Sequence, residues 1–499
     1  QMLIYILLSI GVVGLCYSLL INRLSGLPPG PPPLPVIGNV LSLFSGDSEA
    51  LDKKMLEWKQ RYGNVFTLWV PTPMVFIADH KVMMDAVVRE GDAFAERMVG
   101  KELNRLAVGG DFGLVMNANE MWKEQRRFAL HALRDVGFGT SAVEDCVSAY
   151  AHEAVTRWKA EDGKEIDVTP NIMAAVANTI WRLDFGKTLQ FDDPLFARVR
   201  QLFDEMFPLA ICLFVMLIEV IPPVRHIDFL FGGKLGKLIR LNDQIEAIVN
   251  KEVDEAAAAL GPDDEPNCYV QAYLKEMRRR EDKGEELGTF TRHQLGKAAS
   301  DIWGAGFETT VTTMRYGIHY LINYPEVQRK MQKEIDDKIG DRIIRMEDQR
   351  SLPYCCAAIQ EIQRLANILP LNIFRRVVYD TTVDGHRLKA GTTVIPQFQA
   401  VHMNPEEFER PEYFCPDRFL DDNGDFVKDP RVTPFSVGKR SCLGENLARM
   451  EIFVLLTTFM QHVSFSSTSV VPPKLNVVFG FTRSPKPYTV IVHDRTKNK

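Results

Sequence analysis

The chain has 499 residues, 46% of them hydrophobic and 25% charged, so it can bury a large core and has an ordinary composition for a folded protein. A formal net charge of −6 excludes the strongly basic character of nucleic-acid-binding proteins, and we expect no nucleic acid partner. The eight cysteines contain no Cys-x-x-Cys pair, which argues against a disulfide framework or a zinc site and predicts reduced thiols.

Residues 1–26 are predicted to be an N-terminal membrane anchor. Residues 2–21 carry no charge, and a helix of about 20 residues, rising about 1.5 Å per residue, matches a hydrocarbon layer of roughly 30 Å. A cleavable signal peptide is the alternative, but its apolar core is usually only about 7–15 residues long. Arg23 is the first charge after the run and favours a cytosolic body.

Residues 27–39 contain the proline-rich run PPGPPPLPVIGN. Proline fixes φ and lacks an amide donor, so such a run forms a stiff, extended spacer. A ligand for SH3-type domains is the competing interpretation. The position of the run between an anchor and a folded body favours a strut.

Residues 40–499 are predicted to form one body that is mainly α-helical with small β-sheets, an α+β arrangement. Apolar residues recur with helical spacing over 52–62, 120–134, 143–160, 194–207, 234–255 and 292–323. Strand patterns are short and cover 65–70, 73–78, 377–382, 392–396 and 488–493, with a hairpin turn at Asp384-Gly385. The most apolar internal stretch, 207–221, is predicted to be core, with contact to lipid as the alternative.

The longest predicted helix contains the stretch DIWGAGFETTVTT at residues 301–313. Gly304 and Gly306 each cost about 1 kcal/mol relative to alanine inside a helix, which indicates that the helix makes room for something. Glu308 and Thr309 place an acid and a hydroxyl directly after this gap. A simple kink, with threonine hydroxyls satisfying loosened carbonyls, is the alternative.

The stretch FSVGKRSCLG, residues 435–444, places Cys442 directly before a segment with helical spacing. A helix N-terminus and the cations Lys439 and Arg440 should lower the pKa of a thiol and stabilise its thiolate. The flanking glycines allow a tight turn and close approach to a flat ligand. A haem iron with an axial cysteine fits this loop, whereas a buried, inert cysteine is the alternative for the thiol taken alone.

The spacing Phe-x-x-Gly-x-Arg-x-Cys-x-Gly is complete at Phe435, Gly438, Arg440, Cys442 and Gly444. It resembles the haem-binding signature of the cytochrome P-450 superfamily, and the neighbouring stretches look closest to the animal microsomal, drug-metabolising-type group. The resemblance implies a mainly helical fold in which haem b lies between a long central helix and the cysteine loop. Cys442 would then be the iron ligand.

Further motifs agree with this resemblance in the same chain order. Glu361 and Arg364 match the family's Glu-x-x-Arg pair, and Arg418 in PDRF matches the arginine that completes a buried ion network. Asp417 stands where family members more often have glutamate. The resemblance implies a structural role for these residues, since they support the face of the protein that carries the cysteine loop.

The resemblance also implies contacts to the haem propionates. Trp122 and Arg126 match the family's Trp-x-x-x-Arg motif on one helix, and Arg440 would serve the same charge. Arg375 occupies the position at which the family supplies another donor, although the adjacent Arg376 could replace it. Arginine suits carboxylates because its planar fork donates two hydrogen bonds.

Ala305, Gly306, Glu308 and Thr309 match the family's Ala-Gly-x-Glu/Asp-Thr motif. The resemblance implies that the widened helix accommodates dioxygen, that Thr309 donates a hydrogen bond to it and that Glu308 helps to relay protons. A haem-thiolate isomerase or peroxygenase and a haem sensor or ligand carrier are the rival functions. Neither rival needs an acid–threonine pair, so this motif favours a monooxygenase.

As a member of this family, the protein would insert one oxygen atom of O2 into a lipophilic small molecule by hydroxylation or epoxidation. No dinucleotide fingerprint is visible, so electrons would come from NADPH through a membrane flavoprotein reductase, with a b-type cytochrome as an additional candidate partner. Candidate docking cations are Arg127, Arg134 and Lys439. We expect an endoplasmic reticulum protein with one N-terminal anchor and a cytosolic catalytic domain over 40–499.

The sequence does not identify the substrate. Alignment with the family places four apolar residues at candidate pocket positions, namely Val115, Ala305, Ile373 and Phe481. An apolar pocket of this kind admits fatty acids, steroids and xenobiotics alike.

Overall fold

The computed structural model describes residues 14, 26–34, 37–44, 48–70, 72–97, 101–210, 212–261, 263–467, 477–479 and 482–498. The predicted anchor therefore lies outside the described residues, except for Gly14 and Gly26. Among the described residues, no single helix has both the length and the apolar composition to cross a membrane. Only the bent pair formed by Pro194–Ala210 and Leu213–Glu219, with a 60° angle between its parts, meets that criterion.

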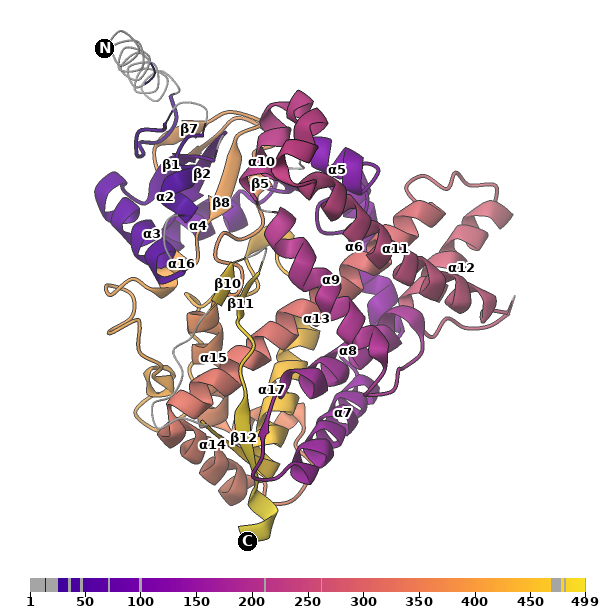
Figure 1. The fold of residues 1–499 in the computed structure, drawn as a ribbon, viewed down its shortest axis with the longest axis vertical. Helices are drawn as coiled ribbons and strands as arrows, with labels where there is room; N and C mark the ends of the chain where they lie inside the picture. The colour runs from indigo at the N-terminus through magenta and orange to yellow at the C-terminus, as the bar shows by residue number, and fades with distance from the viewer. Residues whose placement is uncertain are drawn as a thin grey trace.

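The body is mostly helical and surrounds one long helix, α13 (Arg292–Asn323), which crosses its centre (Figure 1). The other α-helices are α2 (Val40–Phe44), α3 (Ser48–Tyr62), α4 (His80–Met83), α5 (Lys101–Ala107), α6 (Asn119–Asp135), α7 (Ser141–Ala160), α8 (Thr169–Phe185), α9 (Pro194–Ala210), α10 (Leu213–Val220), α11 (Lys234–Ala258), α12 (Tyr269–Asp282), α14 (Pro325–Lys338), α15 (Pro353–Ala366), α16 (Gln399–His402) and α17 (Glu445–His462). Short 3₁₀ or π segments are η1 (Met84–Arg89), η2 (Pro222–Phe231), η3 (Met346–Ser351), η4 (Pro416–Phe419), η5 (Gly438–Arg440) and η6 (Arg495–Asn498). All six predicted helices are confirmed.

The largest sheet of the described residues has the strand order β1-β2-β8-β5-β3. Its strands are β1 (Val65–Trp69), β2 (Pro73–Ile77), β8 (Thr393–Pro396), β5 (Arg375–Arg376) and β3 (Glu96–Arg97). The smaller sheets contain β4 (Glu165–Ile166), β12 (Val490–Asp494) and β9 (Val463–Ser466), then β6 (Thr381–Val383) with β7 (His386–Leu388), and β10 (Val477–Phe479) with β11 (Arg483–Pro485). The antiparallel register of β3 and β5 places Arg97 opposite Arg375, so both side chains leave the same face of the sheet.

The predicted strand over 377–382 is only partly correct. The chain pairs at Arg375–Arg376 and again at Thr381–Val383, and residues 377–380 between them are not strand. The hairpin turn is confirmed, since Asp384 and Gly385 have φ of 48° and 78° and join Val383 to its partner His386. Two positive φ values in sequence are the geometry of a type I′ turn, which Asp-Gly favours.

The proline-rich segment is docked on the sheet rather than free. Thr67 of β1 donates its amide to the Pro29 carbonyl at 2.9 Å and its hydroxyl to the Pro28 carbonyl at 2.8 Å. A Cβ added at Gly30 would collide with the Thr67 backbone, so only glycine permits this approach. The segment thus attaches the start of the body to β1.

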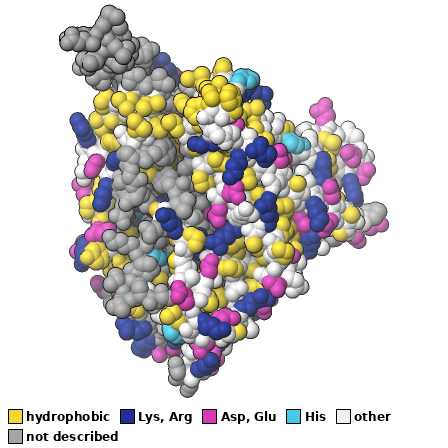
Figure 2. All heavy atoms as spheres, viewed as in Figure 1, with side chains coloured by type: hydrophobic (Ala, Val, Ile, Leu, Met, Phe, Trp, Pro, Cys, Tyr) yellow, Lys and Arg dark blue, Asp and Glu magenta, His cyan; other side chains and the backbone are white. Residues whose placement is uncertain are grey.

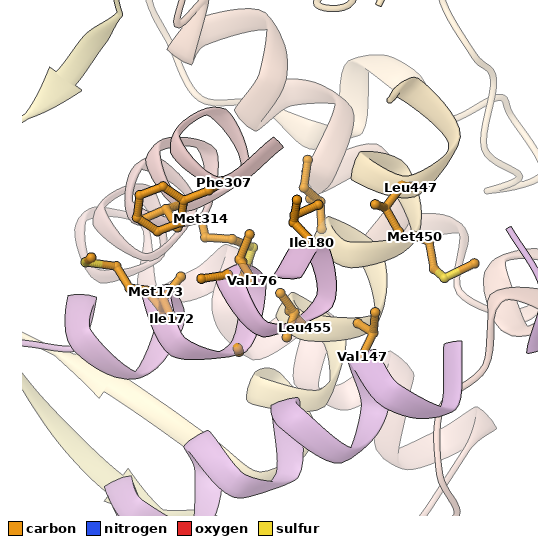
Figure 3. Close-up of a cluster of buried hydrophobic side chains, with 14 of the residues drawn as sticks. Val147, Ile172, Met173, Val176, Ile180, Phe307, Met314, Leu447, Met450 and Leu455 are labelled. Atoms are coloured by element: carbon orange, nitrogen blue, oxygen red, sulfur yellow. The ribbon is translucent and has the colours of Figure 1, made fainter. Parts of the chain in front are cut away.

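The core lies where α8, α13 and α17 meet. Figure 3 shows Val176 and Ile180 of α8 beside Phe307 and Met314 of α13, and Leu455 of α17 near them. The helix α8 is buried on every side, which leaves no polar stripe by which hydrophobic periodicity could detect it, and the sequence analysis missed it. A Cβ added at Gly306 would lie 2.9 Å from Ile180, so this glycine lets α8 pack against α13.

The apolar stretch 207–221, predicted to be core, is buried only in part, since most of its described side chains are half-buried or exposed. Its helix α10 buries Phe214, Val215 and Ile218 in a cluster with two leucines of α11. Only its ends, Leu213 and Ile221, are exposed among the described side chains of α10 and its C-cap. The adjoining η2 differs, because Phe229 is 74% exposed and Leu230 is 67% exposed.

Candidate active site

A cavity of about 1060 Å³ lies between α13 and the cysteine loop, residues 435–444. Its walls bring together Glu308 and Thr309 of α13 with Phe435 and Cys442 of the loop. These residues are more than 120 positions apart in the chain, and they meet because α13 crosses the centre of the body (Figure 1). The cavity therefore joins the predicted acid–hydroxyl pair to the predicted metal ligand.

The cysteine loop is closed by its own backbone. The Cys442 amide donates to the Phe435 carbonyl at 2.9 Å, which ties the two ends of the loop together. Gly438 has φ of 73°, and a Cβ there would collide with the Val87 carbonyl of η1. Gly444, the N-cap of α17, has an ordinary φ of −89°. The tight turn that the sequence analysis assigned to both glycines thus depends on Gly438.

Cys442 faces the cavity and lies just before the N-terminus of α17. Burial raises the pKa of its thiol, although the Gly444 amide and the Arg126 guanidinium act in the opposite direction. The expected lowering of this pKa is therefore wrong for the protein chain alone. A bound metal cation would supply the missing stabilisation, because a coordinating thiol is deprotonated by the ion itself.

The two loop cations have different surroundings. Lys439 is exposed and forms an ion pair with Asp92 at the surface. Arg440 is buried, donates through Nε to the Ala95 carbonyl at 2.5 Å and through Nη2 to the Asn117 carbonyl at 2.7 Å. Its guanidinium lies 3.5 Å from the centroid of the Trp122 ring. The positive charge of the loop at the cavity is thus supplied by Arg440 rather than by Lys439.

Trp122 and Arg126 lie one turn apart on α6, as predicted. Trp122 is buried, and Arg126 donates through Nη2 to the Ser441 carbonyl at 2.7 Å, next to Cys442. Both residues line the cavity. α6 therefore braces the cysteine loop directly.

The edge of the large sheet adds two more buried arginines. Arg375 donates through Nη2 to the Ser436 hydroxyl at 3.0 Å and to the Val437 carbonyl at 2.6 Å. Arg97, opposite it on β3, donates to the carbonyls of Val115 and Ile373 at 3.2 and 2.9 Å. The sequence analysis missed Arg97, because β3 has two residues and only the register with β5 places it here.

This group of cations has donors without partners. Within the described residues, Trp122 Nε1, Arg375 Nε and Nη1, and Arg440 Nη1 are buried without a hydrogen-bond acceptor. Burial lowers the pKa of Arg375 to about 9. Burial, followed by repulsion from Arg126 and Arg375, also lowers the pKa of Arg440 to about 9. Buried like charges with free donors require an anionic partner, and the two propionates of a haem group fit this donor set.

Arg375 and Arg376 are distinguished by their partners. Arg376 reaches the cavity wall, but its Nη2 pairs with Glu96 at 3.2 Å and its side chain is partly exposed. Arg375 is not itself part of the described cavity lining, but it has no exposed surface and retains two donor atoms without acceptors, against one in Arg376. Arg375 is thus the better candidate of the two for a carboxylate contact.

On the opposite wall, Glu308 and Thr309 are each bonded to other groups. The Thr309 hydroxyl donates to the Ala305 carbonyl at 2.7 Å, within α13. Glu308 Oε1 accepts from the hydroxyls of Thr312 and Thr482, both at 3.1 Å. Burial raises the pKa of Glu308, and these hydroxyl hydrogen bonds oppose the rise. The carboxyl thus keeps its proton to higher pH than an exposed glutamate does.

Behind the cysteine loop, the predicted ion network is confirmed. Arg364 donates to Glu361 through Nε at 2.7 Å and through Nη2 at 2.8 Å, and Arg418 Nε lies 3.1 Å from Glu361 Oε1. Glu361 and Arg364 are fully buried on α15. Asp417 stands at the position where the family more often has glutamate. It pairs with Lys330 at 2.9 Å and takes no part in the network.

Of the predicted apolar pocket residues, Val115, Ala305 and Ile373 line the cavity. Phe481 lies outside the described residues. The upper walls come from α5, α9 and α10 and are mostly apolar, with Leu103, Phe203 and Met216 among them. The amide nitrogen of Asn104 on α5 is a buried donor without an acceptor in this wall.

Comparison with known proteins supports the arrangement. A family model described as Cytochrome P450 matches residues 28–492. The probable cytochrome P450 CYP36A1 of Caenorhabditis elegans is 36% identical over 471 residues, covering 94% of this chain and 95% of that protein. Cytochrome P450 2J1 of Oryctolagus cuniculus is 35% identical over 471 residues, covering 94% and 91% respectively. Cytochrome P450 2J2 of Homo sapiens is 34% identical over 466 residues, covering 93% and 90%.

Proposed function

This chain belongs to the cytochrome P450 family of haem-thiolate monooxygenases, and we propose that it oxidises a lipophilic small molecule with electrons taken from NADPH. The observation that carries the proposal is one cavity with a cavity-facing cysteine beside buried, incompletely bonded arginines and an acid–threonine pair opposite. The products would be hydroxylated or epoxidised forms of the substrate.

Cys442 would hold the iron of haem b through its thiolate. Bound haem would supply the oxygen-activating iron, and electron donation from the sulfur favours O–O cleavage. Trp122, Arg126, Arg375 and Arg440 would hold the propionates, and Arg97 joins them by position. Phe435, Gly438 and Gly444 shape the loop that presents the thiol, with Phe435 covered on its outer face by Arg449 at 4.7 Å.

Glu308 and Thr309 are proposed to deliver protons to the cavity. For this role the Thr309 hydroxyl would have to leave the Ala305 carbonyl and turn toward the cavity. Glu308 would then exchange its proton with water and with Thr309. A positioned acid of this kind typically contributes about 10²–10⁴-fold to a proton transfer.

The substrate is proposed to be apolar over most of its surface. The cavity lining outside the arginine group is mainly aliphatic and aromatic, and its polar groups are few. Asp301, although part of the wall, is engaged with the amides of Leu114 and Val115 at 2.6 and 2.8 Å. Asp301 is therefore already satisfied by backbone amides and is not placed to select a cationic substrate.

Electron delivery is proposed to come from an NADPH-dependent flavoprotein reductase, with a b-type cytochrome as a second candidate donor. Arg127 is exposed on α6, the helix that braces the cysteine loop. Arg134 lies near Asp135 and contacts His131, and Lys439 pairs with Asp92. Of the three predicted docking cations, Arg127 is thus the one whose charge is not paired with a neighbouring carboxylate among the described ion pairs.

We also propose attachment to the endoplasmic reticulum membrane, with the catalytic domain in the cytosol. The predicted anchor in residues 1–26 would supply the main attachment. A second contact is favoured by the exposed apolar residues Phe229, Leu230 and Phe231 of η2. Figure 2 shows apolar side chains gathered over α10 and η2, at the top of that view. Exposed aromatic and leucine side chains of this kind partition into the lipid interface.

The absorption spectrum of the dithionite-reduced protein with carbon monoxide tests the proposal. Thiolate-ligated haem should give a strongly red-shifted Soret band. Absence of haem, or the shorter-wavelength band of histidine or thiol ligation in folded protein, would contradict it. With added reductase, NADPH consumption linked to substrate oxidation would separate a monooxygenase from a peroxygenase, an isomerase or a haem sensor.

A further inference from the structure

The Glu308 carboxyl is held by hydroxyl groups from two distant parts of the chain. Thr312 lies one turn further along α13, whereas Thr482 directly precedes β11 and Ser484 lies within it. Their hydroxyl oxygens are 3.1, 3.1 and 3.3 Å from Glu308 Oε1. Because side chains alternate along a strand, Thr482 and Ser484 point to α13 while Arg483 points away and pairs with Asp52 at 2.8 Å.

The three hydroxyls also interact with one another. The Thr312 and Ser484 oxygens are 3.0 Å apart, and either can be the donor. Each hydroxyl carries one proton, and one carboxylate oxygen accepts about two hydrogen bonds. Thr482 can therefore donate to Glu308 directly, while Thr312 and Ser484 share the second position, one donating to Glu308 and the other to its neighbour. Oε1 of an ionised Glu308 is thereby satisfied without water and without Thr309.

We propose that Thr482 and Ser484 are positioning residues that hold Glu308 against β11 and set how readily it takes up and releases the relayed proton. This inference rests on the proposed function, in which Glu308 acts with Thr309. Thr309 is bonded to the Ala305 carbonyl in the same structure, so neither member of the pair bonds the other. In this arrangement Glu308 Oε1 is bonded to the Thr482 and Ser484 hydroxyls and not to Thr309.

The direction of the effect follows from the groups that face Glu308. Burial raises the pKa of Glu308, and Asp204 of α9 acts in the same direction. Hydrogen bonds from the Thr312 and Thr482 hydroxyls and the charge of Arg315, two turns further along α13, lower it. Arg315 is itself held by β11, through the Pro485 carbonyl at 2.6 Å, and α8 presents the apolar Ile180 to this region of α13. The Thr482 and Ser484 hydroxyls donate hydrogen bonds to the ionised carboxylate. If they are removed, burial should raise the pKa of Glu308 further, so Glu308 should keep its proton to higher pH.

The experiment is an infrared titration of the holoenzyme, in which the band of the protonated Glu308 carboxyl is followed against pH. Glu308→Gln identifies the band by its loss. We expect the titration midpoint to shift to higher pH in Thr482→Val and in Ser484→Ala, and further in the double variant. Thr482→Ser, which retains the hydroxyl, should keep the wild-type midpoint. An unchanged or lower midpoint in both single variants would overturn the proposal.

A second readout separates positioning from general damage. The pH profile of coupling, measured as product formed per NADPH, should shift to higher pH with Thr482→Val and return to its wild-type position with Thr482→Ser. The carbon monoxide spectrum of each variant verifies folding and haem binding. A thiolate spectrum with unmoved midpoints would contradict this inference alone, whereas loss of that spectrum in the wild type would contradict the proposed function. If the double variant fails to fold, the two single variants decide the question.

Discussion

The two walls of the cavity bury charged groups that differ in their hydrogen-bond partners. Around the cysteine loop, Arg97, Arg375 and Arg440 are buried beside one another, and donors of Arg375 and Arg440 lack acceptors in the described chain. Across the cavity, the Glu308 carboxyl is supplied with hydroxyl donors from α13 and β11. The arginine donors of the first wall lack an anionic partner within the described chain, whereas Glu308 Oε1 in the second wall receives its hydrogen bonds from the chain itself. The two walls thus differ in how the chain supplies hydrogen bonds to their charged groups.

Arg364 sharpens the comparison because it has the same chemistry and the same burial as Arg375. Both side chains have 0% exposure. Arg364 meets Glu361 through two donors and the carbonyls of His402 and Pro411 through others. Arg375 bonds the Ser436 hydroxyl and the Val437 carbonyl, has no carboxylate partner among the described residues and keeps two nitrogens unpaired. Burial alone therefore does not mark a ligand contact, and the unmet donors of Arg375 gain meaning from their place beside Arg440, Trp122 and the cysteine loop.

The largest effect should come from Cys442→Ser, which removes the proposed iron ligand. We expect loss of the thiolate spectrum and of turnover, because a serine hydroxyl is a poor donor to haem iron. Reduced carbon monoxide spectra and substrate oxidation assays measure both. Cys146→Ser on α7 is the matched control and should change neither. An active Cys442→Ser enzyme with an unaltered spectrum would refute the assignment.

Glu361→Gln should be the most destabilising change outside the cavity. It leaves Arg364 buried without its carboxylate, which typically costs about 3–5 kcal/mol of unfolding free energy. Arg364 would then be a buried arginine with unpaired donors, like Arg375, but without a bound carboxylate to accept its hydrogen bonds. Denaturant unfolding of the holoenzyme measures the loss. Asp417→Asn, which breaks only the half-exposed pair with Lys330, should cost about 1 kcal/mol or less, and equal costs would contradict the distinction.

Arg375→Gln should weaken haem retention while sparing the apoprotein. Loss of one charge-assisted contact to a propionate should speed haem transfer to an acceptor protein by about 10-fold, or about 1.4 kcal/mol. The apoprotein should lose less stability than that, because a desolvated positive charge with depressed pKa is removed. Arg376→Gln is the control, since its guanidinium pairs with Glu96. If Arg376→Gln alone released haem, the assignment of the two residues would be reversed.

Thr309→Ala should have the smallest effect on structure and a clear effect on coupling. We expect haem binding to be retained while electrons are diverted to hydrogen peroxide, with product per NADPH falling by roughly 10-fold. Peroxide and product are measured together at equal NADPH consumption. Thr309→Ser keeps the hydroxyl and should remain closer to wild type. Tight coupling in Thr309→Ala would remove this residue from the proton relay.

Much of the fold was predictable because local pattern and tertiary packing agree. The amphipathic helices α6, α7, α9, α11 and α13 and the Asp384-Gly385 turn were found from periodicity and turn chemistry. α8 escaped because a helix buried all round has no apolar stripe. β5 and β3 escaped because two-residue strands have no period, and only their pairing defines them.

For the site, sequence spacing sufficed where one element carries the residues, as in the cysteine loop, the Trp122–Arg126 turn and the Glu308–Thr309 pair. It failed for Arg97, which reaches the arginine group through the register of β3 with β5. It also failed for the thiol pKa, since helix polarity and cations were judged without the burial that outweighs them. The resemblance gave Gly306 a role in accommodating oxygen. In the structure this glycine also has a packing role, since Ile180 of α8 fills the space beside it.

The sequence by itself determined the chemical groups, namely one thiol in a glycine-containing loop, an acid–threonine pair on a long helix and arginines at motif spacing. It could do so because these groups are encoded by local spacing, which survives without knowledge of the fold. Only the tertiary structure decided which donors stay unpaired, which arginine of the adjacent pair is buried, and that hydroxyls of β11 hold Glu308. Those features depend on contacts across more than a hundred residues of chain, and burial and hydrogen-bond supply are properties of such contacts alone.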